Sequence, residues 1–522
     1  MNNTTQPGAS PTGPAATNNA PAVKSVLRMG VFTLAMINVS AIVSLRGMPA
    51  ESTYGLSSVF YYIFAAVFFL VPVSLVAAEL TTGWPQKGGV YRWVGEAFGK
   101  KWGFLAIWLQ WIESTIWFPT VLTFAAVSLA FMGPGQRWDE ALAANKWYVL
   151  IVVLCVYWAA TLLNLRGMET SAGVTKWGTI IGTIIPGAIL ILLGLSYWAG
   201  GNPILLDMSW DKLVPDMSNF NNLVLAASIF LFYAGMEMSA VHVKDVNNPG
   251  RNYPLAILIS AIITVLIFVL GTLAIGFIIP NSQINLVQSL LITYDSYFSF
   301  FGLGWMNWIL ALALAVGVLA QVTAWVGGPS KGLYQVGLAG NLPPVMQKRN
   351  KNNVQMGILL IQGGIVTLLS IMFVIMPSVQ SAYQIISQLT IILYLIMYML
   401  MFASGIYLRY REPNTPRTFR IPGGRTFGMW VVGGLGLLAS LAAFLVSFIP
   451  PNQITVGSST MYVLLLVVGT FIFAGIPFII HAMAKPSWKR PVDPEDAFEP
   501  FGWEKNNDSH SAATPSHSIS HE

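Results

Sequence analysis

The chain has 522 residues, of which 55% are hydrophobic and only 9% are charged. A typical soluble domain carries about 25% charged residues, so a soluble globular protein is excluded. The net charge of +6 does not indicate a nucleic-acid partner, because the cationic residues lie at the ends of apolar segments. No series of short segments alternates apolar and polar residues, which excludes a β-barrel, and the sequence predicts an all-α polytopic membrane protein.

Apolar runs bounded by turn residues predict twelve membrane-spanning helices. A spanning helix needs about 20 apolar residues, and the stretches 296–330, 352–408 and 426–480 contain no Asp, Glu, Lys or Arg. In chain order, the predicted spans cover residues 27–48, 55–81, 101–132, 147–165, 177–198, 221–243, 254–280, 304–335, 355–376, 380–408, 427–449 and 460–483.

The cationic residues predict the orientation of these helices. If both termini are cytoplasmic, 23 of the 27 Lys and Arg residues fall on the cytoplasmic side. The others are Arg46, near the outer end of the first span, and Arg137, Lys146 and Lys212 in outer loops. Because cytoplasmic loops are enriched in Lys and Arg, we expect a multi-pass protein of the cytoplasmic (inner) membrane with both termini inside.

The predicted helices form one transporter domain, residues 26–483, between two polar tails. Residues 1–25 show neither an apolar h-region nor a cleavage site, so no signal peptide is expected. Residues 484–522 are expected to be flexible. Three His residues in this tail are too widely spaced to favour a metal site, and no metal or cofactor is predicted. They are His510, His517 and His521.

The sixth predicted span contains a break in its apolar pattern. Tyr233, Ala234 and Gly235 interrupt the run, and Glu237 follows closely. Burying an unpaired charge at this depth costs at least about 2.5 kcal/mol, so an intramembrane carboxylate indicates function. An unwound stretch at Gly235 would free carbonyl groups to hold an ammonium group beside Glu237. Alternatively, Gly235 only permits close helix packing and Glu237 forms a structural pair.

The first span carries Asn38 and Ser40 near its middle, and a second break is expected at Val39, Ser40 and Ala41. The N-terminus of a half-helix attracts a carboxylate through its free N–H groups and dipole, so this break would complement the one in the sixth span. No glycine marks the position, and Ser40 could equally bond to its own helix.

Other polar side chains within the spans are further candidates. Glu113 in the third span, flanked by tryptophans, could face a cavity, whereas Glu79 lies near a cytoplasmic end and is expected at the interface. Tyr394 and Tyr398 in the tenth span are four residues apart and share one helix face. Hydroxyl groups in the middle of the membrane need hydrogen-bond partners, and a polar pore supplies them. Alternatively, the two tyrosines belong to the core or to the aromatic belt, where the same spacing occurs.

Motifs for catalysis and nucleotide binding are absent from the sequence. There is no HExxH, GxSxG or P-loop motif, and no Cys and His cluster with metal-ligand spacing. Without an ATP site, uphill transport must use gradients. The sequence therefore predicts a secondary transporter rather than an enzyme.

These residues resemble those of the amino acid–polyamine–organocation superfamily, and within it most closely the bacterial glutamate/GABA antiporter family. The similarity runs from about residue 28 to about residue 484. It is carried by AAELTTGWPQKGGVYRWVGEAFGKKWGF after the second span, FYAGMEMSAVHVKDVNNPGRNYPLA around the sixth, GVLAQVTAWVGGPSKGLY in the eighth, RTFRIPGG at 417–424, and SFIPP before the last outer loop.

The resemblance implies a leucine-transporter-like fold, with a five-plus-five inverted repeat and two additional C-terminal helices. It also implies exchange of an amino acid for a related amine or amino acid, with the two broken helices and Glu237 at the substrate. Trp325 would form a wall or gate, and Tyr394 with Tyr398 would line the path. Gln321 in the eighth span belongs to the same expected site.

Three features depart from the glutamate/GABA exchangers of that family. Those exchangers have Tyr-Glu-Tyr-Pro after the first helix, where this chain has SLRGMP, and a glutamate at the position of Gln321. They also end in a basic, aromatic segment that closes the inner vestibule, and this tail has no such cluster. Glutamate/GABA specificity and acid gating are therefore not predicted. Arg46 would suit an acidic or zwitterionic substrate, or pair with Glu51.

Three functions are compatible with the sequence. The leading hypothesis is an amino acid antiporter that works by alternating access. The second is a proton-coupled symporter with Glu113 or Glu237 as proton carrier. The third is a nutrient sensor that binds without transport, which the modest tails disfavour. The expected partners are an amino acid or amine and the lipid bilayer, while the oligomeric state is open.

Overall fold

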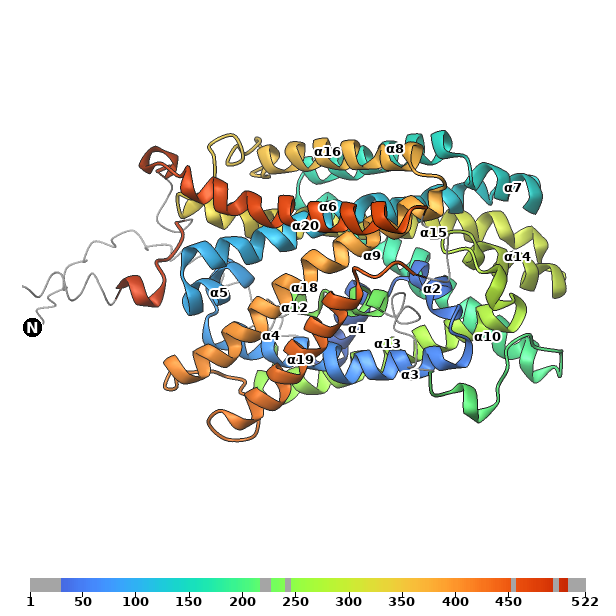
Figure 1. Ribbon diagram of the computed structural model, residues 1–522, viewed down its shortest axis with the longest axis horizontal. Coiled ribbons are helices and arrows are strands. Elements are labelled where there is room, and N and C mark those ends of the chain that lie inside the picture. The colour runs from blue at the N-terminus through green and yellow to red at the C-terminus, as the bar shows by residue number, and fades with distance from the viewer. Residues whose placement is uncertain (1–29, 216–226, 240–245, 452–456, 492–496, 506–522) are drawn as a thin grey trace, which may run out of the picture.

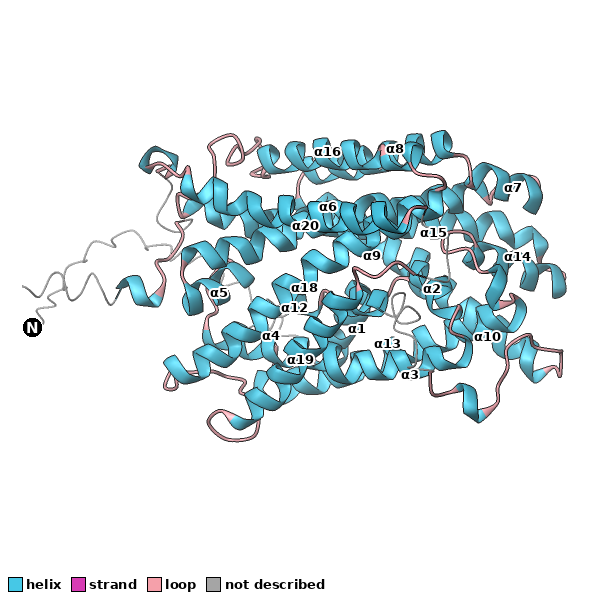
Figure 2. Cartoon of the chain, viewed as in Figure 1, coloured by secondary structure: helices cyan, strands magenta, loops and turns pink. Residues whose placement is uncertain are grey.

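The computed structural model describes residues 30–215, 227–239, 246–451, 457–491 and 497–505 of the chain. Within these ranges the protein is helical and contains no β-strand (Figure 2). The long helices lie side by side along the longest axis, with α5 (Val90–Phe98) toward one end and α7 (Gln136–Ala143) and α14 (Ser289–Phe300) toward the other (Figure 1). The predicted all-α membrane architecture is confirmed at this level.

Ten helical segments of the described chain are long and apolar enough to cross a bilayer, and each coincides with a predicted span. Backbone polar groups in lipid must be satisfied within the protein, which favours uninterrupted helices. The helices concerned are α3 (Ser58–Ala65) with η3 (Ala66–Leu70) and α4 (Val71–Gly83), α6 (Lys100–Ala130), α8 (Lys146–Leu165), α9 (Met168–Thr179) with η4 (Ile180–Ile184) and α10 (Ile185–Ala199), α13 (Pro249–Ile278), α15 (Asn307–Leu338), α16 (Met356–Ser370) with α17 (Met372–Ile375), α18 (Val379–Arg411), α19 (Phe427–Val446) and α20 (Ser459–Ala482).

The first and sixth predicted spans consist of shorter helical pieces. The first comprises α1 (Val31–Ile42), the 3₁₀ turn η1 (Leu45–Gly47) and α2 (Met48–Ser52). The sixth comprises α11 (Ser228–Tyr233) and α12 (Met236–Ser239). Both predicted spans also include residues outside the described ranges. Neither therefore counts among the ten continuous segments.

The core of the molecule is built around α6, whose side chains are buried along almost its whole length. This helix packs against α15 and α18, while α1 packs against α13, and α12 packs against α4 and α1. By contrast, α20 exposes large apolar side chains such as Phe471 and Ile472, as a lipid-facing helix does. This packing brings the candidate residues of the third, eighth and tenth predicted spans to the broken first and sixth helices.

Candidate substrate-binding site

The sixth helix is interrupted at Ala234 and Gly235, between α11 and α12. Gly235 has φ +107°, a backbone conformation that L side chains rarely adopt. A Cβ atom at this position would also lie 3.1 Å from the ring of Trp325. The backbone conformation therefore favours glycine strongly, and a side chain would also force the Trp325 ring to shift. The break lies where the sequence predicts it.

The first helix also breaks, but later than predicted. Val39, Ser40 and Ala41 lie within α1, and the N–H of Val43 still donates to the carbonyl of Val39 at 2.8 Å. The backbone becomes extended only at Val43 and Ser44. The predicted break at Val39–Ala41 is therefore wrong by about one helical turn. This break needs no glycine, because serine and the β-branched valine both adopt an extended backbone readily.

Glu237 is held by a cluster of hydrogen-bond donors, which we call the Glu237 cluster: Gln110, Tyr394 and Tyr398 with Glu237. Its Oε1 accepts from Gln110 Nε2 at 3.0 Å and from the Tyr394 hydroxyl at 2.5 Å, and its Oε2 accepts from the Tyr398 hydroxyl at 2.6 Å. The Tyr398 oxygen in turn accepts from the N–H of Gly235 at 2.9 Å. The buried carboxylate thus fastens the start of α12 to α6 and α18.

A small cavity of about 30 Å³ touches both breaks, at Ser44 and Ala234. Its volume accommodates one or two water molecules. Six residues that the sequence singles out line it: Arg46, Glu113, Ala234, Gln321, Trp325 and Tyr394. Its other lining residues are Ile42, Ser44, Ser114, Trp117, Leu231 and Phe232.

Some predicted site residues lie elsewhere. Tyr233 is fully buried away from the lining, donates to the carbonyl of Tyr62 at 3.1 Å and packs against the ring of Phe268. Val39 is also buried and does not line the cavity. The side chains of Ser40 and Ala41 lie outside what the structure describes. Gly235 and Tyr398 belong to the hydrogen-bonded layer beside the cavity rather than to its lining.

One face of α6 contributes residues that sequence reasoning missed. Gln110 and Trp117 are three residues before and four residues after Glu113, so the three side chains share a face. Gln110 binds Glu237, while the ring of Trp117 lies 5.7 Å from that of Trp325, between ring centroids. The sequence did contain a signal for both residues, because their helical spacing from Glu113 places them on the same face of α6.

The sequence matches the amino acid permease family over residues 29–473. The chain belongs to the amino acid permease family. It is 40% identical over 451 residues to an uncharacterised transporter of Legionella pneumophila, covering 86% of this chain and 96% of that protein. It is 32% identical over 461 residues to the glutamate/gamma-aminobutyrate antiporter of Lactococcus lactis, covering 87% and 90%. A "Probable agmatine/putrescine antiporter" of the same species is 24% identical over 373 residues, covering 71% and 77%.

Family membership confirms several predictions. The permease is a multi-pass membrane transporter of small molecules rather than an enzyme. The resemblance on which the expected site rests is also confirmed, because the relatives include antiporters of amino acids and amines.

A second cavity of the permease, of about 560 Å³, reaches Gln110 of the Glu237 cluster. Its cationic lining residues are Lys87, Lys331 and Arg349, and no described acidic residue lines it. The segment after α4 that carries the superfamily resemblance contributes Pro85, Gly88 and Gly89 from the loop and Trp93 from α5 to the wall. We call this cavity the vestibule. It connects the three cationic side chains with Gln110, which binds Glu237 of the broken sixth helix.

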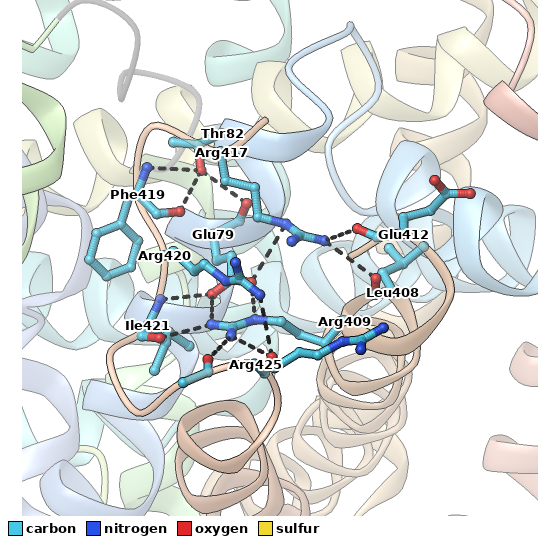
Figure 3. Close-up of polar contacts among 11 residues, drawn as sticks. Glu79, Thr82, Leu408, Arg409, Glu412, Arg417, Phe419, Arg420, Ile421 and Arg425 are labelled. Carbon is cyan, nitrogen blue, oxygen red and sulfur yellow. Dashed lines mark hydrogen bonds and ion pairs between the residues drawn. The ribbon is translucent and has the colours of Figure 1, made fainter. Parts of the chain in front are cut away.

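Glu79, which the sequence places near a cytoplasmic interface, is buried within the protein and only 1% exposed. Arg409 binds its carboxylate through two hydrogen bonds, Nε to Oε1 at 2.5 Å and Nη2 to Oε2 at 2.6 Å (Figure 3). The N–H of Ile421 donates to Oε2 at 2.8 Å, and Arg417 Nε lies 3.6 Å from Oε1. Full pairing makes this burial possible. The network joins α4 to α18 and to the loop that follows α18.

Residues 497–505 of the C-terminal tail fold back onto α5 of the permease. The Arg92 guanidinium donates to the carbonyl of Glu499 at 2.5 Å and lies over the ring of Phe501, 4.9 Å from its centroid. Phe501 itself is fully buried. The aromatic residues of this segment thus find a cationic and apolar surface, while the expected flexibility of the tail stays a prediction. The three tail histidines lie outside the described residues.

Proposed function

We propose that this permease is a secondary amino acid antiporter that works by alternating access. The observation that carries the proposal is the small cavity at which both broken helices meet, with Glu113 and Arg46 in its wall. Unwound helix segments in the membrane offer free N–H and carbonyl groups to the carboxylate and ammonium groups of a substrate. The glutamate/gamma-aminobutyrate antiporter among its relatives supports exchange rather than one-way transport.

The proposed architecture has twelve spans, with a five-plus-five inverted repeat followed by α19 and α20. The ten continuous segments together with the two broken helices support this number. The distribution of Lys and Arg supports cytoplasmic termini in an inner membrane. In this orientation, the vestibule opens to the cytoplasm.

The proposed substrate site comprises Ala234, Gln321, Trp325 and Tyr394, with Ser44 replacing the predicted Val39–Ala41 stretch. The Glu237 cluster keeps the broken sixth helix in place beside it. Glu113 is the better candidate for coupling, because its Oε1 has no hydrogen-bond partner in the described part of the chain. Glu237, in contrast, is occupied by three donors.

Counterflow in proteoliposomes tests the proposal. Vesicles loaded with one unlabelled amino acid or amine are given a labelled amino acid outside, over a panel of both classes. We expect uptake only when the lumen holds a suitable exchange partner. Absence of uptake with every pair would refute transport, and ligand-dependent stabilisation without counterflow would favour the sensor hypothesis.

A proton-coupled symporter is the second candidate, because Glu113 is a buried carboxylate in the cavity wall. Empty vesicles with an imposed pH gradient distinguish the two functions. Accumulation in empty vesicles that Glu113→Gln abolishes would favour symport. The matched control is Glu412→Gln, an exposed carboxylate after α18, which should leave uptake unchanged.

A further inference from the structure

Arg46 is a buried cation in the wall of the small cavity. It lies in η1, directly after the break in the first helix, and is 4% exposed. Its Nη1 donates to the hydroxyl of Tyr383 at 3.0 Å. Its guanidinium also lies 5.2 Å from the ring centroid of Trp117 and 5.8 Å from that of Phe232.

Within the described part of the chain, these contacts leave the charge of Arg46 without a counter-ion. Among the described residues, no carboxylate lies within ion-pair distance of its guanidinium, and Arg46 Nε has no hydrogen-bond partner. Glu51, the alternative partner suggested by the sequence, accepts a hydrogen bond from Ser228 instead. A guanidinium stays protonated in proteins, and an unpaired buried charge is costly. An anion that enters the cavity would relieve this cost.

Glu113 gives the same cavity an acidic wall. It is 2% exposed, and its Oε1 also lacks a partner in the described chain. No ion pair joins it to Arg46 within the described residues. Around this cavity the described residues thus leave one cationic group without a counter-ion, Arg46, and one carboxyl group with a partnerless oxygen, Glu113. The rings of Trp117 and Trp325 also line it. The cavity as it stands holds only one or two water molecules. Once it widens during alternating access, a ligand with a carboxylate and an ammonium group separated by a short carbon chain would satisfy both groups.

We propose that Arg46 is a specificity-determining residue that binds the side-chain carboxylate of an acidic amino acid, with Glu113 facing the ammonium group. This inference rests on the proposed antiport. Decarboxylation of an acidic amino acid removes the α-carboxylate and leaves the side-chain carboxylate and the ammonium group in place. A site that recognises the side-chain carboxylate and the ammonium group accepts both an acidic amino acid and its decarboxylated product. Exchange between these two substrates requires such a site.

A purely structural role is the alternative explanation. In that case Arg46 would only hold α18 to the first helix through Tyr383, and its replacement would weaken transport of every substrate alike. The two explanations therefore differ in substrate dependence. Tyr383→Phe supplies the matched control, because it removes the hydrogen bond to Arg46 and keeps the cation.

The test uses counterflow by the full-length protein in proteoliposomes, with labelled glutamate, γ-aminobutyrate, glutamine and putrescine. Glutamine replaces the side-chain carboxylate by an amide, and putrescine has no carboxylate. For the wild type we expect glutamate and γ-aminobutyrate to be exchanged at least tenfold better than the other two. Arg46→Gln should raise the KM for both carboxylates about 10- to 100-fold and leave glutamine within about threefold. Arg46→Lys should retain part of the preference, and Tyr383→Phe should retain the glutamate-to-glutamine ratio.

Two results would overturn the inference about Arg46: an equal loss for all four substrates in Arg46→Gln, or an unchanged glutamate-to-glutamine ratio. A second readout separates this failure from failure of antiport itself. Thermal unfolding of the purified protein is measured with glutamate or glutamine. Stabilisation by glutamate that disappears in Arg46→Gln supports carboxylate binding even if counterflow is absent, whereas equal stabilisation of both variants contradicts it. Similar unfolding temperatures without ligand show that the variant is folded.

Discussion

The hydroxyl oxygen of Tyr398 lies 2.9 Å from the backbone nitrogen of Gly235, where the sixth helix is unwound. The same hydroxyl donates to Glu237, two residues further along, at 2.6 Å. One side chain of α18 therefore satisfies the N–H freed by the break and holds the carboxylate that follows it. A buried backbone group without a partner is costly, so this contact stabilises the unwound conformation.

Tyr398→Phe is expected to weaken both stability and transport. The change leaves the Gly235 N–H unsatisfied and removes one donor from Glu237, at a cost of about 1–3 kcal/mol. Tyr394→Phe is the matched control for stability, because Oε1 of Glu237 keeps its bond from Gln110. Thermal unfolding is measured for both variants, and counterflow for Tyr398→Phe. An equal or larger loss of stability in Tyr394→Phe would contradict the role assigned to Tyr398.

Gly235→Ala should reduce exchange at least tenfold while the protein still inserts into the membrane. The new Cβ would require an unfavourable positive φ and would lie 3.1 Å from the Trp325 ring. Gly475→Ala in α20, where no neighbour would lie within 4 Å of the added methyl group, should keep normal exchange. Membrane yield, size-exclusion profile and counterflow are compared. Full activity of Gly235→Ala would show that the break is not required.

Glu113→Gln and Glu237→Gln are expected to behave differently. We expect Glu113→Gln to fold normally and to remove the pH dependence of transport, since its Oε1 is free of partners in the described chain. Glu237→Gln would place an amide NH₂ among three donors and should lower the unfolding temperature. Transport is measured between pH 5 and 8 with thermal unfolding in parallel. Persistence of the pH dependence in Glu113→Gln would exclude it as the coupling group.

Asp139 in α7, outside the spans, should make stability depend on pH. Burial raises the pKa of its carboxyl group, Asp295 and Glu140 reinforce the shift, and the N–H of Gly135 opposes it. Because the folded pKa lies above the unfolded value, its stabilising contribution is present at low pH and is lost as pH rises through the folded pKa. Asp139→Asn should therefore gain stability relative to the wild type between pH 4 and pH 7.

Asp207 provides a control of opposite sign for this experiment. Hydrogen bonds from Ser209 lower the pKa of its exposed carboxyl group. Asp207→Asn should consequently show no gain relative to the wild type as pH rises. Thermal unfolding at a series of pH values measures both variants, and a gain for Asp207→Asn matching that for Asp139→Asn would contradict the assignment.

Arg409→Met is expected to destabilise the protein by about 3–5 kcal/mol, because Glu79 would remain buried without its two-bond partner. Arg411→Met, two residues along α18 and exposed, should change stability by no more than about 0.5 kcal/mol. Denaturation in detergent is compared for both variants. Similar stability of the two would mean that Arg417 alone compensates Glu79.

Much of the candidate site was predictable because it depends on local chemistry. Gly235 and Glu237 stand out in an apolar run. Glycine permits a positive φ, and glutamate indicates an intramembrane carboxylate, so the residue types alone predict both features. The break in the first helix was misplaced, because the extended Val43 and Ser44 carry no glycine signal. The burial of Glu79 and the docking of Phe501 on α5 were missed for a different reason. Both depend on partners that are hundreds of residues away, Arg409 and Arg92.

The sequence by itself determined the membrane architecture and the transporter class. A chain with few charged residues and long apolar runs forms membrane-spanning helices in lipid. Both properties are visible in the sequence residue by residue. Only the tertiary structure decided which polar groups are satisfied. It pairs Glu237 with donors from α6 and α18. Among the described residues, it leaves Arg46 and Glu113 with unpaired atoms around one cavity. Hydrogen bonding between helices depends on how they pack, and packing is a property of the whole fold.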